Sequence, residues 1–289
     1  MTEAPFRPRR SVLYLPVTNA RALEKAKTLA CDAVVLDLED SVAPELKAEA
    51  REAAMAAIAA GGFGRRELIV RVNGLDTPWG DADLKAMSQA GPDGVLVPKI
   101  NDSGDVARYD GRLSQAPDKT RLWVMIETAR SLFHLDGIAG AARNTRLACM
   151  TIGPNDLAKE TGATFAGARE PLWAAMSLTV AAARAYGVTP LDGVFNSVTD
   201  AEGFARECAQ ARTFGFEGKS VIHPNQIGPC NAAFAPSAEE LAWAEAVIAA
   251  FASPDSDGRG AIRVDGKMVE RLHLIQAERL IAAANIADA

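Results

Sequence analysis

Short apolar runs rich in β-branched residues alternate with longer alanine-rich stretches along most of the chain. Eight runs have the length and composition of buried strands, and they lie at 11–17, 33–39, 67–73, 94–100, 121–128, 147–153, 189–195 and 219–224. Strands that are each followed by a helix usually form a parallel sheet, because the helix returns the chain to the same end of the sheet. The pattern therefore predicts an α/β fold with a parallel sheet.

The stretches between these runs mix apolar and polar residues, as helices packed on a sheet do. They lie at 19–30, 44–60, 81–90, 128–142, 171–187 and 200–215, and a weaker stretch after the fourth run is expected to hold a short helix. Eight strand–helix units are the number that closes a (β/α)8 TIM barrel. A doubly wound open sheet is the alternative. It would usually carry a glycine-rich turn after its first strand, and residues 15–21, LPVTNAR, contain no glycine.

The C-terminal part of the chain extends beyond what a barrel needs. It opens with a predicted helix that has Ser237 as N-cap and Glu240 in the matching position of a capping box. Residues 252–260 have the composition of a flexible linker, and the last segment opens with a turn and ends as a helix. We therefore expect two domains, which are a (β/α)8 barrel catalytic domain over 1–235 and a C-terminal helical lid and intersubunit segment over 236–289.

Composition and charge exclude several classes of protein. The 289 residues carry a formal net charge of −6, and no block of lysine and arginine stands out beyond 7–10, so nucleic acid is not an expected partner. The four cysteines form no C-x-x-C pair, which argues against a disulfide framework or a zinc site and favours a reducing, cytoplasmic location. We expect no signal peptide, and no apolar stretch approaches the ~18 residues of a membrane span.

Charged and polar residues recur where seven of the eight predicted strands end, which is the end that carries the catalytic residues of TIM barrels. From the second strand to the eighth, they are Asp37, Glu39 and Asp40; Arg71 and Asn73; Lys99; Glu127; Asn155 and Asp156; Asp192; and His223. Any one of them is more often a helix cap or a solvated loop residue. Together, acids from three strands that face Arg71 and Lys99 indicate one charged site, provided that the barrel forms.

The acids at 37–40 directly follow a buried apolar run, and buried carboxylates are costly unless they are neutralised. Glu127 and Asp156 suit a hard divalent cation such as Mg²⁺, and the acids at 37–40 would then hold the waters of the metal. The same acids equally suit an ion pair with Arg71 of the neighbouring strand, and both arrangements are compatible. His223 is followed by proline, so we expect it to end the eighth strand and bond to backbone rather than act as a base.

With these residues in place, the sequence resembles the citrate lyase beta-subunit-like family of the aldolase/citrate lyase superfamily, which includes malyl-CoA and citramalyl-CoA lyases. The matching motifs lie at 10–26, 32–51, 69–84, 94–100, 126–131, 152–163, 215–227 and 265–270. The resemblance implies a TIM barrel with a C-terminal lid, assembled as a homotrimer or hexamer. It implies a Mg²⁺ ion held by Glu127 and Asp156, substrate binding by Arg71, and contacts of Tyr14 and Lys25 with the adenine and phosphate of coenzyme A.

One position departs from the pattern of the family. Its CoA lyases supply an acid from the C-terminal segment of the neighbouring subunit, usually the Asp that ends DGKMID, whereas this chain reads DGKMVE and has Glu270 there. Glutamate is one methylene longer, so it suits the same proton transfer from a shifted backbone, and it also suits a different substrate or a changed reaction. Asp265 is a second candidate for this acid.

The resemblance therefore implies a magnesium-dependent carbon–carbon lyase. Its substrate would be a 3-hydroxyacyl-CoA of the malyl-CoA or citramalyl-CoA type, cleaved by retro-Claisen chemistry to an acyl-CoA and a 2-oxo acid. The expected catalytic residues are Arg71, Asp40 and Glu270, and the expected substrate contacts are Arg71, Glu39 and Asn155. Two alternatives stay open: an acyl-CoA thioesterase that uses the same site, and a citrate lyase beta subunit that acts on an acyl carrier protein.

Overall fold

The computed structural model describes residues 7–165, 168–253, 256 and 258–287. The chain divides into two compact units, one formed by Arg9–Ala233 and one that contains Phe234–Ala289. The linker expected at 252–260 falls partly outside the described residues.

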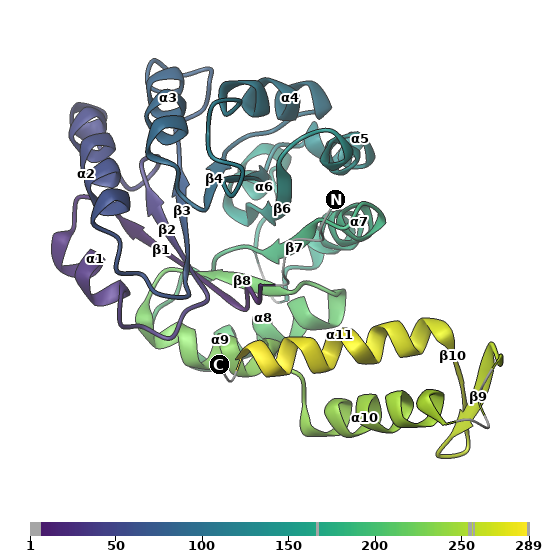
Figure 1. The fold of residues 1–289 in the computed structure, drawn as a ribbon. Helices are drawn as coiled ribbons and strands as arrows, with labels where there is room; N and C mark the ends of the chain where they lie inside the picture. Colours follow the sequence, from purple (N-terminus) through teal and green to yellow (C-terminus); the bar gives the residue numbers. More distant parts are fainter. Residues whose placement is uncertain (1–6, 166–167, 254–255, 257, 288–289) are drawn as a thin grey trace. The chain divides into compact units, whose positions relative to one another are not determined.

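The first unit is a closed barrel of eight parallel strands in sequence order, with β1 paired to both β2 and β8 (Figure 1). The strands are β1 Ser11–Pro16, β2 Ala33–Asp37, β3 Glu67–Arg71, β4 Gly94–Val97, β5 Arg121–Ile126, β6 Leu147–Ile152, β7 Thr189–Asp192 and β8 Gly218–Val221. Each predicted apolar run forms one strand. The TIM barrel is therefore confirmed and the open sheet is excluded.

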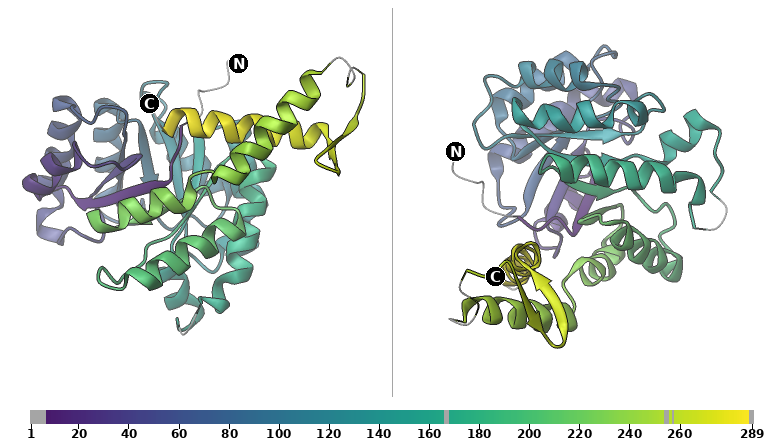
Figure 2. Two further views of the ribbon diagram at one scale, coloured as in Figure 1. Left: turned by 90° about the horizontal axis from the view of Figure 1, so that it is seen from below. Right: turned by 90° about the vertical axis from the view of Figure 1, so that its right-hand side faces the viewer.

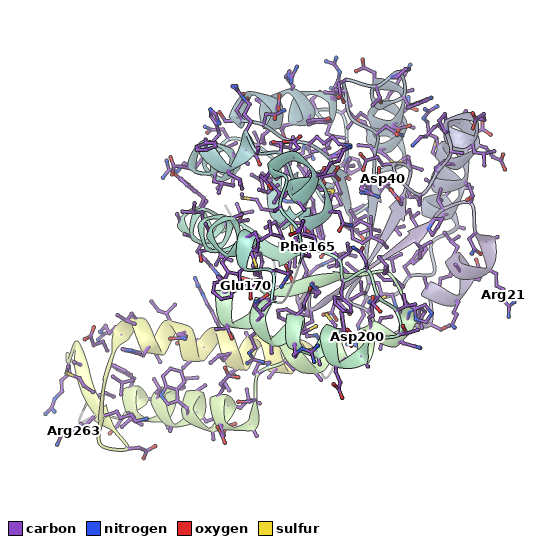
Figure 3. The ribbon with its side chains drawn as sticks, turned by 180° about the vertical axis from the view of Figure 1, so that it is seen from behind. Arg21, Asp40, Phe165, Glu170, Asp200 and Arg263 are labelled. Atoms are coloured by element: carbon purple, nitrogen blue, oxygen red, sulfur yellow. The ribbon has the colours of Figure 1, made fainter. Side chains whose placement is uncertain are left out.

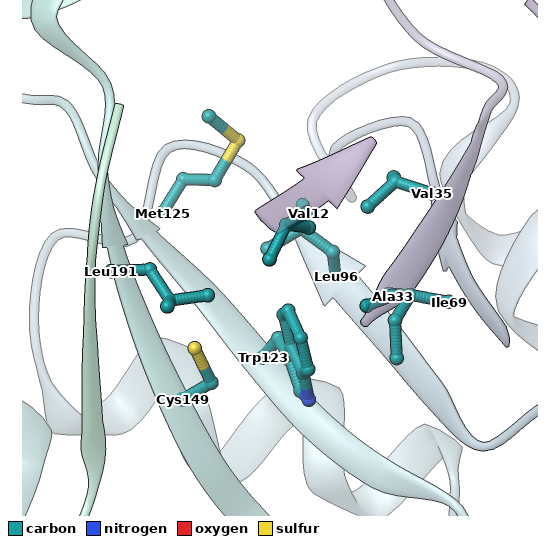
Figure 4. Close-up of a cluster of buried hydrophobic side chains, with 9 residues drawn as sticks. All are labelled: Val12, Ala33, Val35, Ile69, Leu96, Trp123, Met125, Cys149 and Leu191. Carbon is teal, nitrogen blue, oxygen red and sulfur yellow. The ribbon is translucent and has the colours of Figure 1, made fainter. Parts of the chain in front are cut away.

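The interior of the barrel is filled by side chains that alternate along the strands. Every strand except β8 contributes to this apolar cluster, which Figure 4 shows and which consists of Val12, Ala33, Val35, Ile69, Leu96, Trp123, Met125, Cys149 and Leu191. The same alternation continues two residues further along β2, β3 and β5. It therefore directs Asp37, Arg71 and Glu127 toward the mouth of the barrel.

Helices connect the strands, and two of them, Pro154–Thr161 and Ile227–Phe234, lie outside the predicted stretches. The helices are α1 Ala20–Ala26, α2 Lys47–Ala60, α3 Gly80–Ala90, α4 Ser103–Arg112, α5 Leu135–Gly140, α6 Pro154–Thr161, α7 Trp173–Ala185, α8 Ala201–Phe214 and α9 Ile227–Phe234. The short helix expected after the fourth strand is α4. The prediction of one helix over 128–142 was wrong, because α5 is flanked by the 3₁₀ turns Ser131–Phe133 and Ala141–Arg143. Gly137 and Gly140 both lie inside α5, so the poor helix propensity of glycine does not explain where the helix is interrupted.

The second unit consists of α10 Ala238–Ala252, a hairpin of β9 Ala261–Val264 and β10 Lys267–Glu270, and α11 Arg271–Ala287 (Figure 2). The predicted capping box of Ser237 and Glu240 is confirmed. Ala244 and Val247 of α10, Val269 of β10 and Ala277 of α11 form its apolar core. The sequence predicted the turn but not the hairpin. Among the described residues, no helix has the length and apolarity that crossing a bilayer requires.

Candidate active site

A cavity of about 460 Å³ opens at the carboxyl ends of the barrel strands. The charged residues on its wall are Asp37, Asp40, Arg71, Glu127 and Asp156. They come from four different segments: β2 and the loop after it, β3, the residue after β5, and α6. The barrel thus gathers the strand-end residues that the sequence separates by more than a hundred positions.

Arg71 is the centre of the charge network in this cavity. Its Nε and Nη2 donate to Oδ1 and Oδ2 of Asp37 at 2.7 and 2.8 Å, because the register of the sheet pairs these two residues across β2 and β3. Its Nη1 donates to Asp40 Oδ2 at 3.2 Å. Burial raises the pKa of Asp37, but the hydrogen bond and charge of Arg71 outweigh it and hold this pKa below its usual range. The ion pair with Arg71 that the sequence suggested is therefore present.

Glu39 contacts two cationic side chains, those of Arg71 and Lys99. Its Oε2 lies 2.9 Å from Arg71 Nη1, and its Oε1 accepts a hydrogen bond from Lys99 Nζ at 3.0 Å. Burial raises the pKa of Glu39, and the charge of Arg71 offsets part of the rise. The residues that line the cavity include Arg71 and Asp40 but neither Glu39 nor Lys99. The substrate contact expected of Glu39 stays a prediction. In the structure, Glu39 contacts Arg71 and Lys99.

Glu127 is a deeply buried carboxyl that directly follows β5. Its Oε1 accepts the main-chain N–H of Lys99 at 2.8 Å. Burial and the negative charge of Glu39 raise its pKa to about 8. Gly153 makes room for this side chain, since a Cβ at that position would lie 2.5 Å from both Cβ and Oε2 of Glu127.

Asp156 lies in the first turn of α6, where the helix dipole favours a negative charge. Its neighbour Asn155 exchanges two amide hydrogen bonds, at 3.2 and 2.9 Å, with Asn196 of the loop after β7. All three side chains line the cavity. The sequence analysis missed Asn196 because it took Asp192 as the polar residue of the seventh strand. The sequence shows Asn196 as a polar residue four positions after Asp192, and this was the signal that could have identified it.

The donor set of the cavity fits a hard divalent cation. Glu127 and Asp156 share its wall, and Glu127 has a neutral amide as its hydrogen-bond donor and a raised pKa, which a nearby cation would lower. The described residues contain no group of three or more His, Cys, Asp and Glu arranged around a metal. Mg²⁺ usually needs fewer, because water and substrate oxygens complete its octahedral shell.

Tyr14 and Lys25 lie in different environments. Tyr14 lines the cavity and its ring centroid is 5.5 Å from the guanidinium of Arg71, so this ring lies inside the barrel rather than at the rim. The parity of β1 explains this, because Tyr14 follows inward-facing Val12 by two residues. Lys25 is exposed in the last turn of α1, the peripheral helix on which Figure 3 labels Arg21. The same figure shows Asp40 among the loops of the barrel.

The two acids proposed from the C-terminal motif belong to the second unit. Glu270 ends β10 with an exposed side chain, and its main-chain N–H donates to His273 Nδ1 at 2.9 Å. Asp265 occupies the turn of the hairpin with a φ of 50°, followed by Gly266 with a φ of 78°. A turn with both φ values positive suits a tight hairpin.

Two other strand-end residues have structural roles. Asp192 follows inward-facing Leu191, so it points out of the barrel, where it bonds Lys219 at 2.6 Å and Arg169 at 3.0 Å. His223 Nδ1 accepts the main-chain N–H of Asn225 at 3.2 Å, which confirms the expected backbone contact.

An eight-stranded parallel barrel with a charged cavity at the carboxyl ends of its strands defines a TIM-barrel enzyme. The chain belongs to the HpcH/HpaI aldolase/citrate lyase family, whose pattern matches residues 10–224. Residues 171–287 also match the family described as C–C bond lyases of the TIM-barrel fold. The family inferred from the sequence motifs is thus confirmed, and the protein is an enzyme of a lyase family.

Three known proteins illustrate the similarity. The (3S)-malyl-CoA thioesterase of Cereibacter sphaeroides strain KD131 is 43% identical over 277 residues, which cover 96% of this chain and 95% of that protein. The L-malyl-CoA/beta-methylmalyl-CoA lyase of C. sphaeroides strain ATCC 17025 is 34% identical over 311 residues, with 99% and 97% coverage. The structure of CitE from Mycobacterium tuberculosis in complex with magnesium, acetoacetate and coenzyme A is 30% identical, with a TM-score of 0.75 and coverage of 99% and 100%.

Proposed function

We propose that the protein is a magnesium-dependent lyase that cleaves a 3-hydroxyacyl-CoA of the malyl-CoA or citramalyl-CoA type to an acyl-CoA and a 2-oxo acid. The observation that carries the proposal is the cavity wall shared by Arg71, Glu127 and Asp156. Related proteins are named as acting on malyl-CoA, and the CitE structure contains magnesium, an oxo acid and coenzyme A. These names describe the relatives and support the same substrate class here.

Arg71 is placed to stabilise the negative charge that develops on the thioester oxygen as the acyl half becomes an enolate. Its guanidinium is buried and fixed by Asp37 through two hydrogen bonds, so it needs little reorganisation. The guanidinium of Arg71 also lies over the ring of Tyr14, 5.5 Å from its centroid. Asn155, which pairs with Asn196 on the same wall, would orient the polar groups of the 2-oxo-acid half.

Glu127 and Asp156 would hold the magnesium ion. When bound, Mg²⁺ supplies Lewis acidity to the hydroxyl and carboxylate oxygens of the 2-oxo-acid half. The main-chain N–H of Lys99 orients Glu127, and Gly153 leaves the space that its carboxyl group needs.

Proton transfer would use Glu270 of a neighbouring subunit, with Asp265 as the second candidate. Asp40 is the other candidate group, since it lines the cavity and its side chain is 63% exposed. Lys25, exposed on α1, would contact a phosphate of coenzyme A. We expect a homotrimer or hexamer, because Glu270 would have to reach the site of a neighbour. A cytoplasmic location stays a prediction.

A thioesterase is the second candidate, and a specific observation favours it: the 43% identity to proteins named (3S)-malyl-CoA thioesterase exceeds the 34% identity to the malyl-CoA lyase. The same cavity would serve, with Arg71 stabilising the tetrahedral oxyanion after water attacks the thioester. Asp40 is the exposed carboxylate beside Arg71 that would activate this water.

The test is a magnesium-dependent assay with racemic malyl-CoA and citramalyl-CoA. Phenylhydrazine traps any 2-oxo acid, and a thiol reagent reports free CoA. We expect 2-oxo acid without free CoA, lost on chelation and in Glu127→Ala. Free CoA without 2-oxo acid would establish the thioesterase instead. The matched control is Asp81→Asn, an exposed acid of α3 paired with Arg112, which should retain activity.

If neither product forms from free CoA thioesters, the same assay with acyl carrier protein thioesters tests the third alternative. Activity only with the carrier protein would identify a citrate lyase beta subunit.

A further inference from the structure

Lys99 contacts both Glu127, a candidate metal ligand, and Glu39, which contacts Arg71. The sequence analysis grouped Lys99 with the site but gave it no role. Lys99 directly follows Pro98 after β4 and has a φ of 53°, in the left-handed region that non-glycine residues seldom adopt. Such strained conformations persist where the surroundings enforce them, and they concentrate at functional sites.

The left-handed backbone lets one residue contact two carboxylates. The main-chain N–H of Lys99 donates to Glu127 Oε1 at 2.8 Å, and its ammonium donates to Glu39 Oε1 at 3.0 Å. The ammonium is attracted most strongly by Glu39, whose hydrogen bond and charge raise the pKa of Lys99 despite its partial burial. Lys99 is therefore a permanent cation beside the carboxylate of Glu39.

The geometry of Glu39 shows what this cation does. Glu39 Oε2 lies 2.9 Å from Arg71 Nη1, yet among the described residues no N–H is aligned with that oxygen as a hydrogen bond. The two groups attract each other as an ion pair without the directional bond that a free carboxylate would form with a guanidinium. Lys99 holds the other oxygen of the same carboxylate.

The remaining partners of Nη1 are weak or easily displaced. Asp40 accepts from Nη1 at 3.2 Å, but its side chain is 63% exposed and is free to turn into solvent. Met125 Sδ lies at 3.9 Å and is a poor acceptor. Glu39 is the strong buried competitor, and Lys99 restrains it.

We propose that Lys99 is a positioning residue for Arg71: its ammonium holds the Glu39 carboxylate off the hydrogen-bonding direction of Nη1, so that an N–H of this donor stays available to the oxygen of the bound thioester. This inference rests on the proposed function for the identity of the oxygen. Lys99 does not line the cavity, so it acts on the substrate only through Glu39 and Arg71. Without it, both oxygens of Glu39 would turn onto Arg71 and compete with the substrate.

The experiment is a double-mutant cycle between Lys99→Met and Glu39→Gln. Methionine keeps an unbranched stem and the same backbone requirement but removes the charge. We expect Lys99→Met to lower kcat about tenfold, because the donor is withheld when charge develops on the thioester oxygen. In the Glu39→Gln background the same substitution should lower kcat no further. Lys99→Arg, which keeps the charge, should restore most of the lost rate.

Two readouts separate this role from a merely structural one. Calorimetry should show that Lys99→Met does not weaken Mg²⁺ binding, because removing a cation beside the candidate ligands does not disfavour another cation. A crystal structure of Lys99→Met should show Glu39 hydrogen-bonded to Arg71 Nη1. Equal losses of kcat in both backgrounds, or weakened Mg²⁺ binding with an unmoved Glu39, would overturn the proposal. If the wild type cleaves no thioester, the proposed function fails, and the crystal structure alone decides whether Lys99 restrains Glu39.

Discussion

At the scale of single residues, Glu127 is the group whose protonation should be visible in the stability of the protein. Its pKa is raised from 4.5 to about 8, first by burial and then by the charge of Glu39. Between these values the folded protein retains a proton that the unfolded chain has released. The stabilisation from this group is therefore complete below about pH 4.5 and is lost as pH rises through the folded value.

We therefore predict that, in the presence of a chelator, the free energy of unfolding falls more steeply between pH 5 and pH 8 in the wild type than in Glu127→Gln. Urea unfolding followed by circular dichroism measures both slopes. Glu39 also has a raised pKa, but it is present in both proteins, so the difference isolates Glu127. Parallel slopes would show that Glu127 titrates as an ordinary surface carboxyl does.

Gly153 sets the position of the same carboxyl by leaving space. In Gly153→Ala the new Cβ would lie 2.5 Å from Cβ and Oε2 of Glu127, so the glutamate must move. We predict that Mg²⁺ affinity, measured by calorimetry, falls at least about tenfold, whereas the overpacking lowers the free energy of unfolding by only about 1–3 kcal/mol.

The matched control for this substitution is Gly137→Ala in α5, where the nearest atom to a new Cβ is Ser103 Oγ at 3.7 Å. Alanine is the better helix former, so this variant should retain Mg²⁺ affinity and gain about 0.5–1 kcal/mol of stability. Unchanged Mg²⁺ binding in Gly153→Ala would contradict the assignment of Glu127 as a ligand.

At the scale of secondary structure elements, a buried ion network joins β7, β8 and α8. Lys219 Nζ bonds Asp192 Oδ2 at 2.6 Å, with both side chains fully buried, and also contacts Glu207 at 3.1 Å. Burial raises the pKa of Asp192, but Lys219 and Arg169 outweigh it and keep the carboxylate ionised. The network holds the two strands that precede Gly193 and Ile222 on the cavity wall.

We predict that Lys219→Met destabilises the protein by about 3 kcal/mol, because it leaves Asp192 buried with Arg169 as its remaining close cation. Thermal and urea unfolding measure the loss. Lys119→Met is the control: Lys119 is 61% exposed and lies 3.4 Å from Asp93, so its removal should cost less than about 0.5 kcal/mol. Equal effects of the two substitutions would contradict the structural role of the network.

The elements that the sequence predicted well are those whose signal is local. Each strand of the barrel is a short apolar run, and the capping box of α10 follows from the residue types of Ser237 and Glu240. The hairpin of β9 and β10 was missed because each strand has only four residues, which is too short for an apolar alternation to stand out, although β9 directs Ile262 and Val264 toward the core of its unit. The interruption of the helix around α5 was missed because its start carries no side-chain N-cap that the sequence would show.

The candidate site was predictable only in part, because its parts obey different rules. The strand ends that bear Arg71 and Glu127 follow from the barrel topology. The inward position of Tyr14 follows from the parity of β1, which the sequence analysis did not apply. The contacts of Lys99 depend on its left-handed backbone conformation, which the types of the neighbouring residues do not predict. The contact of Asn196 with Asn155 depends on the path of the loop after β7.

At the scale of the whole molecule, the candidate site residues are divided between the two units of the chain. The barrel unit carries Arg71, Glu127 and Asp156, and the other unit carries Glu270 at the end of its hairpin. The family resemblance implies that this acid acts in a neighbouring subunit. If it does, the enzyme is a symmetric oligomer in which each site combines residues of two chains.

This division predicts complementation between two inactive variants. Glu127→Gln lacks the candidate metal ligand, and Glu270→Gln lacks the candidate proton donor. When the two are co-expressed with different affinity tags, a mixed oligomer contains sites that combine an intact Glu127 with the intact Glu270 of a neighbour. If each site draws on two chains, about a quarter of the sites regain both groups at equal incorporation. We expect the doubly purified oligomer to recover activity in that proportion, measured with the substrate that the wild type turns over. If Glu270 served its own chain, every site would lack one group and the mixture would stay as inactive as its parents. A Glu270→Gln homo-oligomer with full activity would remove this residue from the chemistry and leave Asp265 or Asp40 as the proton donor.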